Sequence, residues 1–206
     1  MERYKKLIKK LGLGILLASL FSGSVMAATD LKFALDWKFE GPSAPFFTGL
    51  ERGYYAASGL DVTIDSGKGS LDAIPKVASG TYPIGIADIN SLIKFKDKNP
   101  NAKVIGVMMF YDAPPFAIIG RKSLGVSKPK DLEGKILGAP APDGAYAQWN
   151  SFVLANGIDA SKVTIENVGF PVREPMLAQG KVHAITGFSF SSYINLKYKG
   201  VPESDI

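Results

Sequence analysis

The pair Asp36-Trp37 has the residue types best suited to chemistry, and it directly follows an alternating apolar segment, residues 31–35. A Trp at the carboxyl end of a strand can stack on a planar ring, while an adjacent carboxylate accepts hydrogen bonds from an amino group. The pair therefore indicates a site for an aromatic solute. The alternative is a Trp buried in the core, and the sequence alone leaves both interpretations open.

Two further segments combine a turn with a helix start. Gly67-Lys-Gly-Ser70 lacks the glycine that a nucleotide-binding loop carries five residues before Gly-Lys, because that position is Val62. Its backbone N–H groups could still bind a carboxylate, sulfonate or phosphate, or the segment is a plain turn. Residues 142–146 repeat the arrangement, and Asp143 is the expected N-cap of the helix that follows.

No catalytic centre can be assembled from the remaining residues. The chain has no cysteine, which excludes disulfides, thiolate metal sites and cysteine nucleophiles. Its one histidine, His183, lies in an apolar segment and is interpreted as a structural strand residue. Arg173-Glu174 is interpreted as a solvated or lobe-edge pair at a helix start. These observations favour a binding protein without cofactor or metal over an enzyme.

The candidate residues need an alternation of strands and helices to position them. Apolar patterning predicts strands at residues 31–35, 60–64, 84–87, 104–110, 116–119, 136–138, 163–168 and 182–186. Helices are expected at 46–57, 71–78, 145–155, 172–179 and 189–199, with another capped by Asp88. Such alternation predicts an α/β fold with parallel or mostly parallel sheets and helices on both faces.

A break in this rhythm around residues 113–116 predicts two lobes, the first over residues 28–115 and the second over residues 116–206. Ligands of open α/β folds bind outside the carboxyl ends of the strands, so we expect a ligand cleft between the lobes. Ordinary turn chemistry is the alternative role for each residue at these ends. The candidate ligand-binding residues there are Asp36, Trp37, Gly69, Ser70, Asp88, Tyr111, Asp143, Tyr146, Phe188 and Ser189.

The charge distribution changes the meaning of the overall charge. A formal net charge of +5 on 206 residues would suggest a nucleic acid or an anionic membrane as partner. However, five basic residues crowd the first ten positions, an uncharged run follows, and Val25 and Ala27 occupy the positions that a signal peptidase reads. This pattern predicts a secretory signal peptide over residues 1–27, and the run is shorter than the roughly 20 apolar residues of a membrane span. We therefore expect a soluble, nearly neutral periplasmic protein with no nucleic-acid partner.

A series of short motifs resembles a known family. The motifs are Asp36-Trp37, Glu51-Arg-Gly-Tyr-Tyr55, Gly59-Leu-Asp-Val62, Gly67-Lys-Gly-Ser70, Val77-Ala-Ser-Gly80, Ile84-Gly-Ile-Ala-Asp88, Lys130-Asp-Leu-Glu-Gly-Lys135 and Asn156-Gly-Ile-Asp159. In order and spacing they resemble the periplasmic substrate-binding proteins of ABC importers in the nitrate, sulfonate, taurine and thiamine-pyrimidine-precursor group.

The resemblance implies a type II periplasmic binding fold, a small-molecule solute in the cleft, an ABC permease in the inner membrane as partner, and a monomer. Asp36-Trp37 looks most like the branch that binds aminopyrimidines related to thiamine; the alternatives are sulfonate, taurine or nitrate. Trp37 would stack on the ring, Asp36 would contact its polar edge, and residues 67–70 and 143–146 would hold substituents.

Two departures accompany the resemblance. His183 stands where the family usually carries Asp. Members of this group also usually continue from the second lobe back to the first, whereas this sequence ends at Ile206. The resemblance therefore predicts a truncated chain with an incomplete first lobe that leaves apolar surface uncovered.

An enzyme is the alternative function. The thiamine-pyrimidine synthases share this fold and consume their own histidine together with pyridoxal phosphate. They also carry a cluster of cysteines around iron, which this chain lacks.

Overall fold

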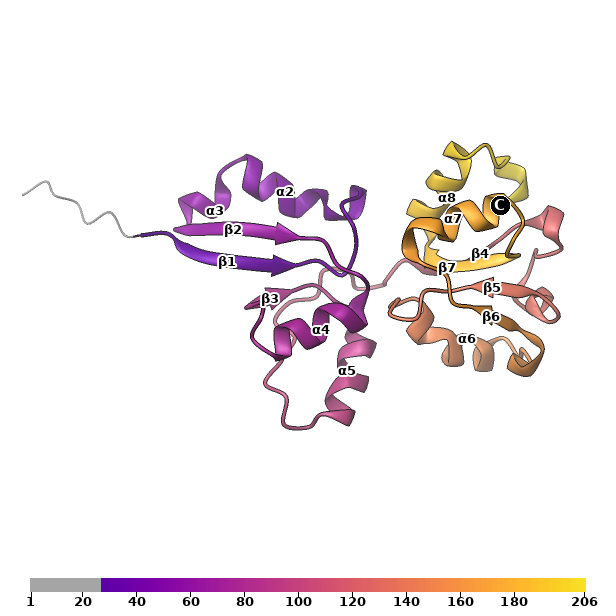
Figure 1. Ribbon diagram of the computed structural model, residues 1–206, viewed down its shortest axis with the longest axis horizontal. Coiled ribbons are helices and arrows are strands. Elements are labelled where there is room, and N and C mark those ends of the chain that lie inside the picture. Colours follow the sequence, from indigo (N-terminus) through magenta and orange to yellow (C-terminus); the bar gives the residue numbers. More distant parts are fainter. Residues whose placement is uncertain (1–26) are drawn as a thin grey trace, which may run out of the picture.

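The computed structural model describes residues 27–206, so nearly all of the predicted signal peptide lies outside the described residues. Two α/β lobes lie side by side, each built on its own sheet (Figure 1). Within residues 27–206, no helix combines the length and the apolar character that crossing a bilayer requires.

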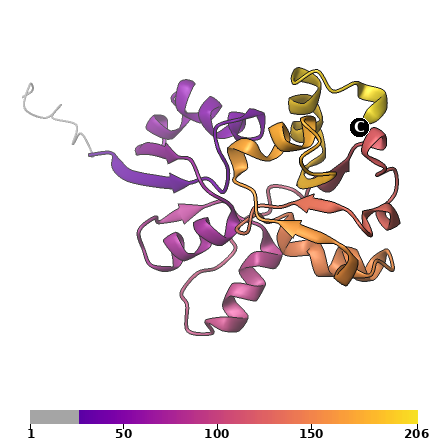
Figure 2. The same cartoon turned by 45° about the vertical axis from the view of Figure 1, so that its right-hand side comes forward.

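The first lobe contains a parallel sheet in the order β2-β1-β3, with β1 at Thr29–Ala34, β2 at Leu60–Asp65 and β3 at Ile84–Gly85. Helices α2 (Ala44–Glu51) and α3 (Tyr54–Ala57) lie on one side of this sheet, and α4 (Ser70–Ala78) and α5 (Ile89–Lys98) on the other (Figure 2). Leu35, Val62 and Ile64 form its buried core, against which aromatic side chains of α2 and α3 pack.

One predicted helix is divided in the structure. Residues 46–57 were expected to form a single helix, but α2 ends at Glu51 and α3 begins at Tyr54. Gly53 between them has a φ of 67°, a left-handed conformation that breaks the helical hydrogen-bond ladder and that glycine adopts without steric cost.

The strand predicted over residues 104–110 is wrong. This segment has no strand assignment, and no strand of the described residues pairs with it. Val104 is buried, whereas Ile105, Val107, Met108 and Met109 are each more than 60% exposed. The apolar pattern alone could not show the absence of a hydrogen-bonded neighbour, without which an extended segment is not a strand. The first lobe thus presents the uncovered apolar surface that was expected.

The second lobe contains a four-stranded sheet in the order β4-β7-β5-β6. Its strands are β4 (Phe116–Gly120), β5 (Ile136–Gly138), β6 (Thr164–Glu166) and β7 (Ala184–Phe188), and only the β4–β7 pair among them is antiparallel. Two hydrophobic clusters flank this sheet. One includes Trp149 of α6 (Trp149–Ala155), and the other joins Leu177 of α7 (Arg173–Ala178) to Leu196 of α8 (Ser189–Tyr198).

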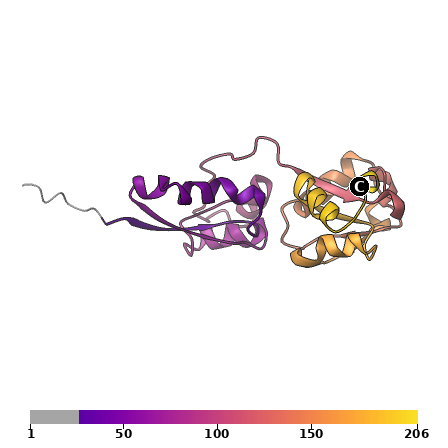
Figure 3. The same ribbon diagram turned by 90° about the horizontal axis from the view of Figure 1, so that it is seen from above.

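A single passage of backbone connects the two lobes within residues 27–206. It leaves α5, runs through residues 99–115, and enters β4 (Figure 3). The two sheets therefore share no strand, and the residues between them come from loops at the strand ends.

Candidate functional site

The carboxyl ends of strands from both sheets face one another, because one cavity is lined by residues of the loops after β1 and β5 and by the last residues of β7. The cavity volume is about 20 Å³, which leaves room for roughly one water molecule. A ring-sized solute therefore enters only if the lobes move apart. The cavity is lined by Asp36, Trp37, Gly69, Ser70, Phe116, Asp143, Gly144, Arg173, Gly187, Phe188 and Ser191.

Asp36 is the titratable group of the first lobe in this cavity. Its Oδ2 accepts a hydrogen bond from Ser70 Oγ at 3.3 Å, and Ser70 Oγ in turn accepts from the backbone N–H of Asp88 at 2.9 Å. Desolvation raises the pKa of Asp36 to about 6, and the charges of Asp143 and Asp88 add to this rise. A buried carboxylate with negative neighbours is stabilised most by a ligand that brings hydrogen-bond donors or positive charge.

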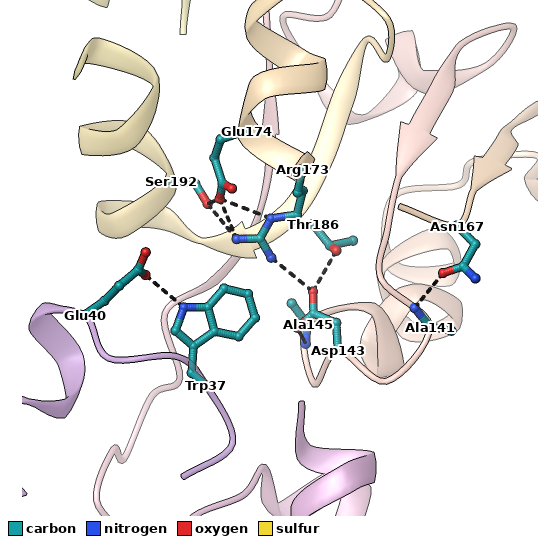
Figure 4. A network of polar contacts seen from close by, with 10 residues as sticks. All are labelled: Trp37, Glu40, Ala141, Asp143, Ala145, Asn167, Arg173, Glu174, Thr186 and Ser192. Carbon is teal, nitrogen blue, oxygen red and sulfur yellow. Dashed lines mark hydrogen bonds and ion pairs between the residues drawn. The ribbon is translucent and has the colours of Figure 1, made fainter. Parts of the chain in front are cut away.

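Trp37 lies against side chains of the second lobe. Its ring meets Phe170 edge-on at a centroid distance of 4.4 Å, and the guanidinium of Arg173 lies 4.8 Å from the centroid of the indole. The indole Nε1 donates to Glu40 Oε2 at 2.8 Å, which fixes the ring orientation (Figure 4). Trp37 is therefore part of the cavity wall, and its ring is in contact with the opposite lobe.

A buried ionic network supports the second-lobe side of the cavity (Figure 4). Arg173 donates to Glu174 Oε1 from Nε at 3.1 Å and from Nη2 at 2.5 Å, and Ser192 Oγ donates to the same oxygen at 2.9 Å. Asp143 Oδ2 accepts from Thr186 Oγ1 at 2.8 Å and lies 3.6 Å from Arg173 Nη1. These contacts fix the guanidinium on the second lobe.

The pKa values of the two carboxyl groups of this network are shifted in opposite directions. Burial raises the pKa of Asp143, an effect that the Arg173 charge only partly offsets. Burial also acts to raise the pKa of Glu174, but the charge and hydrogen bonds of Arg173 outweigh it and hold that pKa below its usual value. Glu174 is therefore ionised and paired with Arg173.

Sequence reasoning missed the role of Arg173-Glu174. Of the two expected positions, the solvated pair is wrong, because Arg173 is 1% exposed and Glu174 3% exposed, whereas the lobe-edge position agrees with the contact of Arg173 with Trp37 of the first lobe. The guanidinium packs directly on Gly187, where an added Cβ would lie 3.1 Å from Nη2. A glycine at this strand position was the available signal, although only the fold places it beneath Arg173.

The two lobes also make direct contacts around the cavity. Gly69, at φ 103° and ψ 163°, lies so close to the second lobe that an added Cβ would be 2.1 Å from the carbonyl oxygen of Pro142. Gln148 Nε2 donates to Asp88 Oδ2 at 3.2 Å, and Lys94 Nζ donates to the carbonyl oxygen of Ala147 at 2.5 Å. The lobes are thus in a closed arrangement.

Six of the ten candidate ligand-binding residues line the cavity, and four do not. Asp88 is buried beside it as the N-cap of α5, accepting from the backbone N–H of Ser91 at 2.7 Å. Tyr111 packs edge-on against Phe188, Tyr146 packs against the core of the second lobe, and Ser189 is exposed at the start of α8. The six that line it are Asp36, Trp37, Gly69, Ser70, Asp143 and Phe188.

The turn at residues 67–70 has its donors directed at protein groups. Gly67 N–H and Gly69 N–H donate to the carbonyls of Trp37 and Asp36, and Leu71 N–H donates to that of Pro142 at 3.4 Å. In the closed arrangement, Gly67 and Gly69 are therefore bonded within the first lobe, and the adjacent Leu71 of α4 makes the hydrogen bond to the second lobe.

His183 occupies a structural position. Its Nδ1 accepts from the backbone N–H of Ile136 at 3.2 Å, and burial together with the nearby Lys135 lowers its pKa. It directly precedes β7, whereas the cavity lies at the other end of that strand, about 16 Å away for five residues of extended chain.

Two α/β lobes with a cavity between their strand ends define a type II periplasmic binding protein fold, and solved structures agree. The alkanesulfonate-binding protein SsuA from Xanthomonas axonopodis pv. citri, bound to MOPS, superposes with a TM-score of 0.63 at 14% identity. That match covers 84% of this chain and 59% of the SsuA chain.

The chain belongs to the NMT1/THI5 like family, which it matches over residues 41–205. It is 24% identical over 160 residues to the riboflavin-binding protein RibY of Chloroflexus aurantiacus, covering 77% of this chain and 45% of RibY. It is also 26% identical over 194 residues to the formylaminopyrimidine-binding protein of Halalkalibacterium halodurans, covering 90% of this chain and 57% of that protein.

An enzyme is also among the relatives. The 4-amino-5-hydroxymethyl-2-methylpyrimidine phosphate synthase of Schizosaccharomyces pombe is 22% identical over 185 residues, which cover 88% of this chain and 52% of the synthase. The chain thus spans about half the length of the curated relatives that it matches.

Proposed function

We propose that this chain is the solute-binding component of an ABC importer and that its cleft takes an amino-substituted heteroaromatic ring of the pyrimidine type. The observation that carries the proposal is the cavity between the lobes, where the Asp36 carboxylate and the rings of Trp37, Phe116 and Phe188 meet. Flat apolar walls combined with one acceptor group suit a ring that bears an amino substituent.

The state of Asp36 supports this ligand class. Its raised pKa reflects a carboxylate that lacks water and has other carboxylates as neighbours. An amino group, or a protonated ring nitrogen, would donate a charge-assisted hydrogen bond to it. A sulfonate or nitrate would instead add a negative charge next to Asp36.

The proposal includes the cellular context. An importer's binding component is exported, as the basic and apolar pattern of residues 1–27 predicts, and delivers its solute to a membrane permease. The binding proteins among the relatives are consistent with this role. We propose that the chain acts as a monomer.

The synthase is the second candidate function, favoured by the similarity to the enzyme of Schizosaccharomyces pombe. A synthase of that kind consumes an active-site histidine. His183, the one histidine of this chain, lies at the opposite end of β7 from the cavity and bonds to the backbone of Ile136. This geometry favours the binding role.

Isothermal titration calorimetry of the purified chain tests the proposal. We expect saturable binding of 4-amino-5-hydroxymethyl-2-methylpyrimidine and none of taurine or nitrate at the same concentrations. Asp36→Asn should weaken pyrimidine binding at least tenfold, since a hydrogen bond to a charged group is worth about 1.5–3 kcal/mol. Asp61→Asn, which changes an exposed carboxylate on β2, is the matched control and should bind like the wild type.

Two outcomes would overturn the proposal. Tight taurine or nitrate binding in the absence of pyrimidine binding would assign the cleft to anions. Formation of a pyrimidine phosphate on incubation with pyridoxal phosphate and ferrous iron, with loss of His183 detected by mass spectrometry, would favour the synthase.

A further inference from the structure

Arg173 contributes the one buried donor of the cavity that lacks a hydrogen-bond partner among the described residues. Nε and Nη2 are bonded to Glu174, whereas Nη1 has no hydrogen-bond acceptor and only the longer contact of 3.6 Å to Asp143 Oδ2. Its side chain is 2% exposed, so bulk water does not satisfy this nitrogen. A buried and unsatisfied donor is costly, which makes Nη1 a candidate contact for an acceptor atom of a ligand.

The guanidinium is held in place without help from the first lobe. Its bonds to Glu174 and Ser192, and its packing on Gly187, all lie within the second lobe. Across the cavity it contacts the ring of Trp37. When the lobes separate, Arg173 therefore remains oriented, with Nη1 directed at Asp143 (Figure 4), and both residues line the cavity between the lobes.

The charges around Arg173 define which kind of acceptor fits. Glu174 already pairs with the guanidinium, and Asp143 lies against Nη1. A fully charged anion would bring a third negative group to one positive charge, close to Asp36 in the same cavity. A carbonyl, formyl or hydroxyl oxygen accepts a hydrogen bond without adding this repulsion.

Resting on the proposed function, we propose that Arg173 Nη1 is a specificity subsite for a neutral acceptor oxygen on the ring solute. Asp36 receives the amino group of the same solute. The cleft would thus select rings that carry both a donor and a neutral oxygen, and would reject sulfonates.

A pair of ligands that differ in one oxygen tests the subsite. The affinities of the full chain for 4-amino-5-hydroxymethyl-2-methylpyrimidine and for 4-amino-2,5-dimethylpyrimidine are measured by calorimetry. We expect the wild type to prefer the hydroxymethyl compound at least tenfold, as a charge-assisted hydrogen bond predicts. Ethanesulfonate should not bind at the concentrations that saturate the chain with the pyrimidine.

The decisive variant is the double substitution Arg173→Gln with Glu174→Gln, because it removes the two charges of this ion pair together and does not leave Glu174 as an unpaired carboxylate, while Asp143 keeps its hydrogen bond from Thr186. The ratio of the two dissociation constants should fall to near one. Arg173→Lys, which keeps the charge but not the fork of donors, should give a ratio between those of the double variant and the wild type. Circular dichroism establishes that each variant is folded.

The possible outcomes distinguish a failure of the proposed Arg173 subsite from a failure of the proposed binding function. If neither pyrimidine binds the wild type, the proposed function fails. If both bind with equal affinity, or if the preference survives the double substitution, the subsite is refuted while the binding role stands. Ethanesulfonate binding that depends on Arg173 would overturn the subsite by showing an anion in its place.

Discussion

Replacement of Gly69 by alanine should obstruct closure of the lobes without touching any charged group. Gly69 has φ 103° and ψ 163°, a region that is essentially restricted to glycine and costs other residues about 1–3 kcal/mol. An added Cβ would also lie 2.1 Å from the Pro142 carbonyl oxygen, well inside any real contact. The two lobes would have to separate by about 1 Å at this point to relieve the overlap.

The expected loss follows from the contacts that closure makes. Separation near Gly69 stretches the Leu71 N–H hydrogen bond to Pro142 and moves Trp37 away from Arg173. We expect the dissociation constant for 4-amino-5-hydroxymethyl-2-methylpyrimidine to rise at least tenfold, which corresponds to about 1.4 kcal/mol. Calorimetry measures the affinity, and small-angle X-ray scattering of the free chain should show a larger radius of gyration.

Gly80→Ala is the matched control. Gly80 also has a positive φ, 78°, but an added Cβ would meet no atom within 4 Å. This variant therefore incurs backbone strain and leaves the lobe contact intact, so its pyrimidine affinity should equal that of the wild type. Equal weakening in Gly69→Ala and Gly80→Ala would refute the reasoning, as would normal affinity in Gly69→Ala.

Three further predictions concern single side chains. Trp37→Ala should weaken pyrimidine binding about tenfold, because it removes ring contact worth about 0.5–1.5 kcal/mol beyond burial; unchanged calorimetric affinity would place Trp37 outside the binding surface. The pKa of Asp36 is about 6 in the folded chain and 3.8 in the unfolded chain. Because the folded chain therefore binds more protons between these two pH values, the contribution of Asp36 to stability decreases as pH rises from about 4 to about 6. Asp36→Asn should therefore increase the free energy of unfolding at pH 7 by at most about 3 kcal/mol, which is measured as a higher urea midpoint. A lower urea midpoint would contradict this prediction. Hydrogen bonds from Ser123, together with Arg121, lower the pKa of Asp205 to about 2, so its stabilising effect is complete above about pH 4 and is lost as pH falls toward 2. Asp205→Asn should lower the thermal midpoint at neutral pH, with the difference from wild type vanishing near pH 2.

Local patterns in the sequence predicted much of the fold. Alternating apolar residues located β1, β2 and most strands of the second lobe, and the residues that follow them do surround one cavity. The same reasoning failed for residues 104–110, since pairing depends on a neighbouring strand that no local pattern reveals.

The site was only partly accessible to sequence reasoning. Asp36 and Trp37 were recognisable because they directly follow a strand, whereas Tyr146 looked similar at a helix start but packs into the core of the second lobe. Arg173 was misinterpreted, because its burial depends on Gly187, Ser192 and Asp143, which lie far from it in sequence. Charge and sequence position do not reveal which side chains a sheet brings around an arginine.

The single passage of backbone between the lobes has a mechanical consequence. Within residues 27–206, residues 111–115 belong to the covalent link between the lobes, whereas one lobe docks on the other through surfaces away from this link. The direction of approach must then be set by the surfaces that meet, chiefly Gly69 against Pro142 and Lys94 against Ala147. A bound solute would act as a third point of alignment between these surfaces, so the precision of docking would depend on the cargo as well as on the direct contacts.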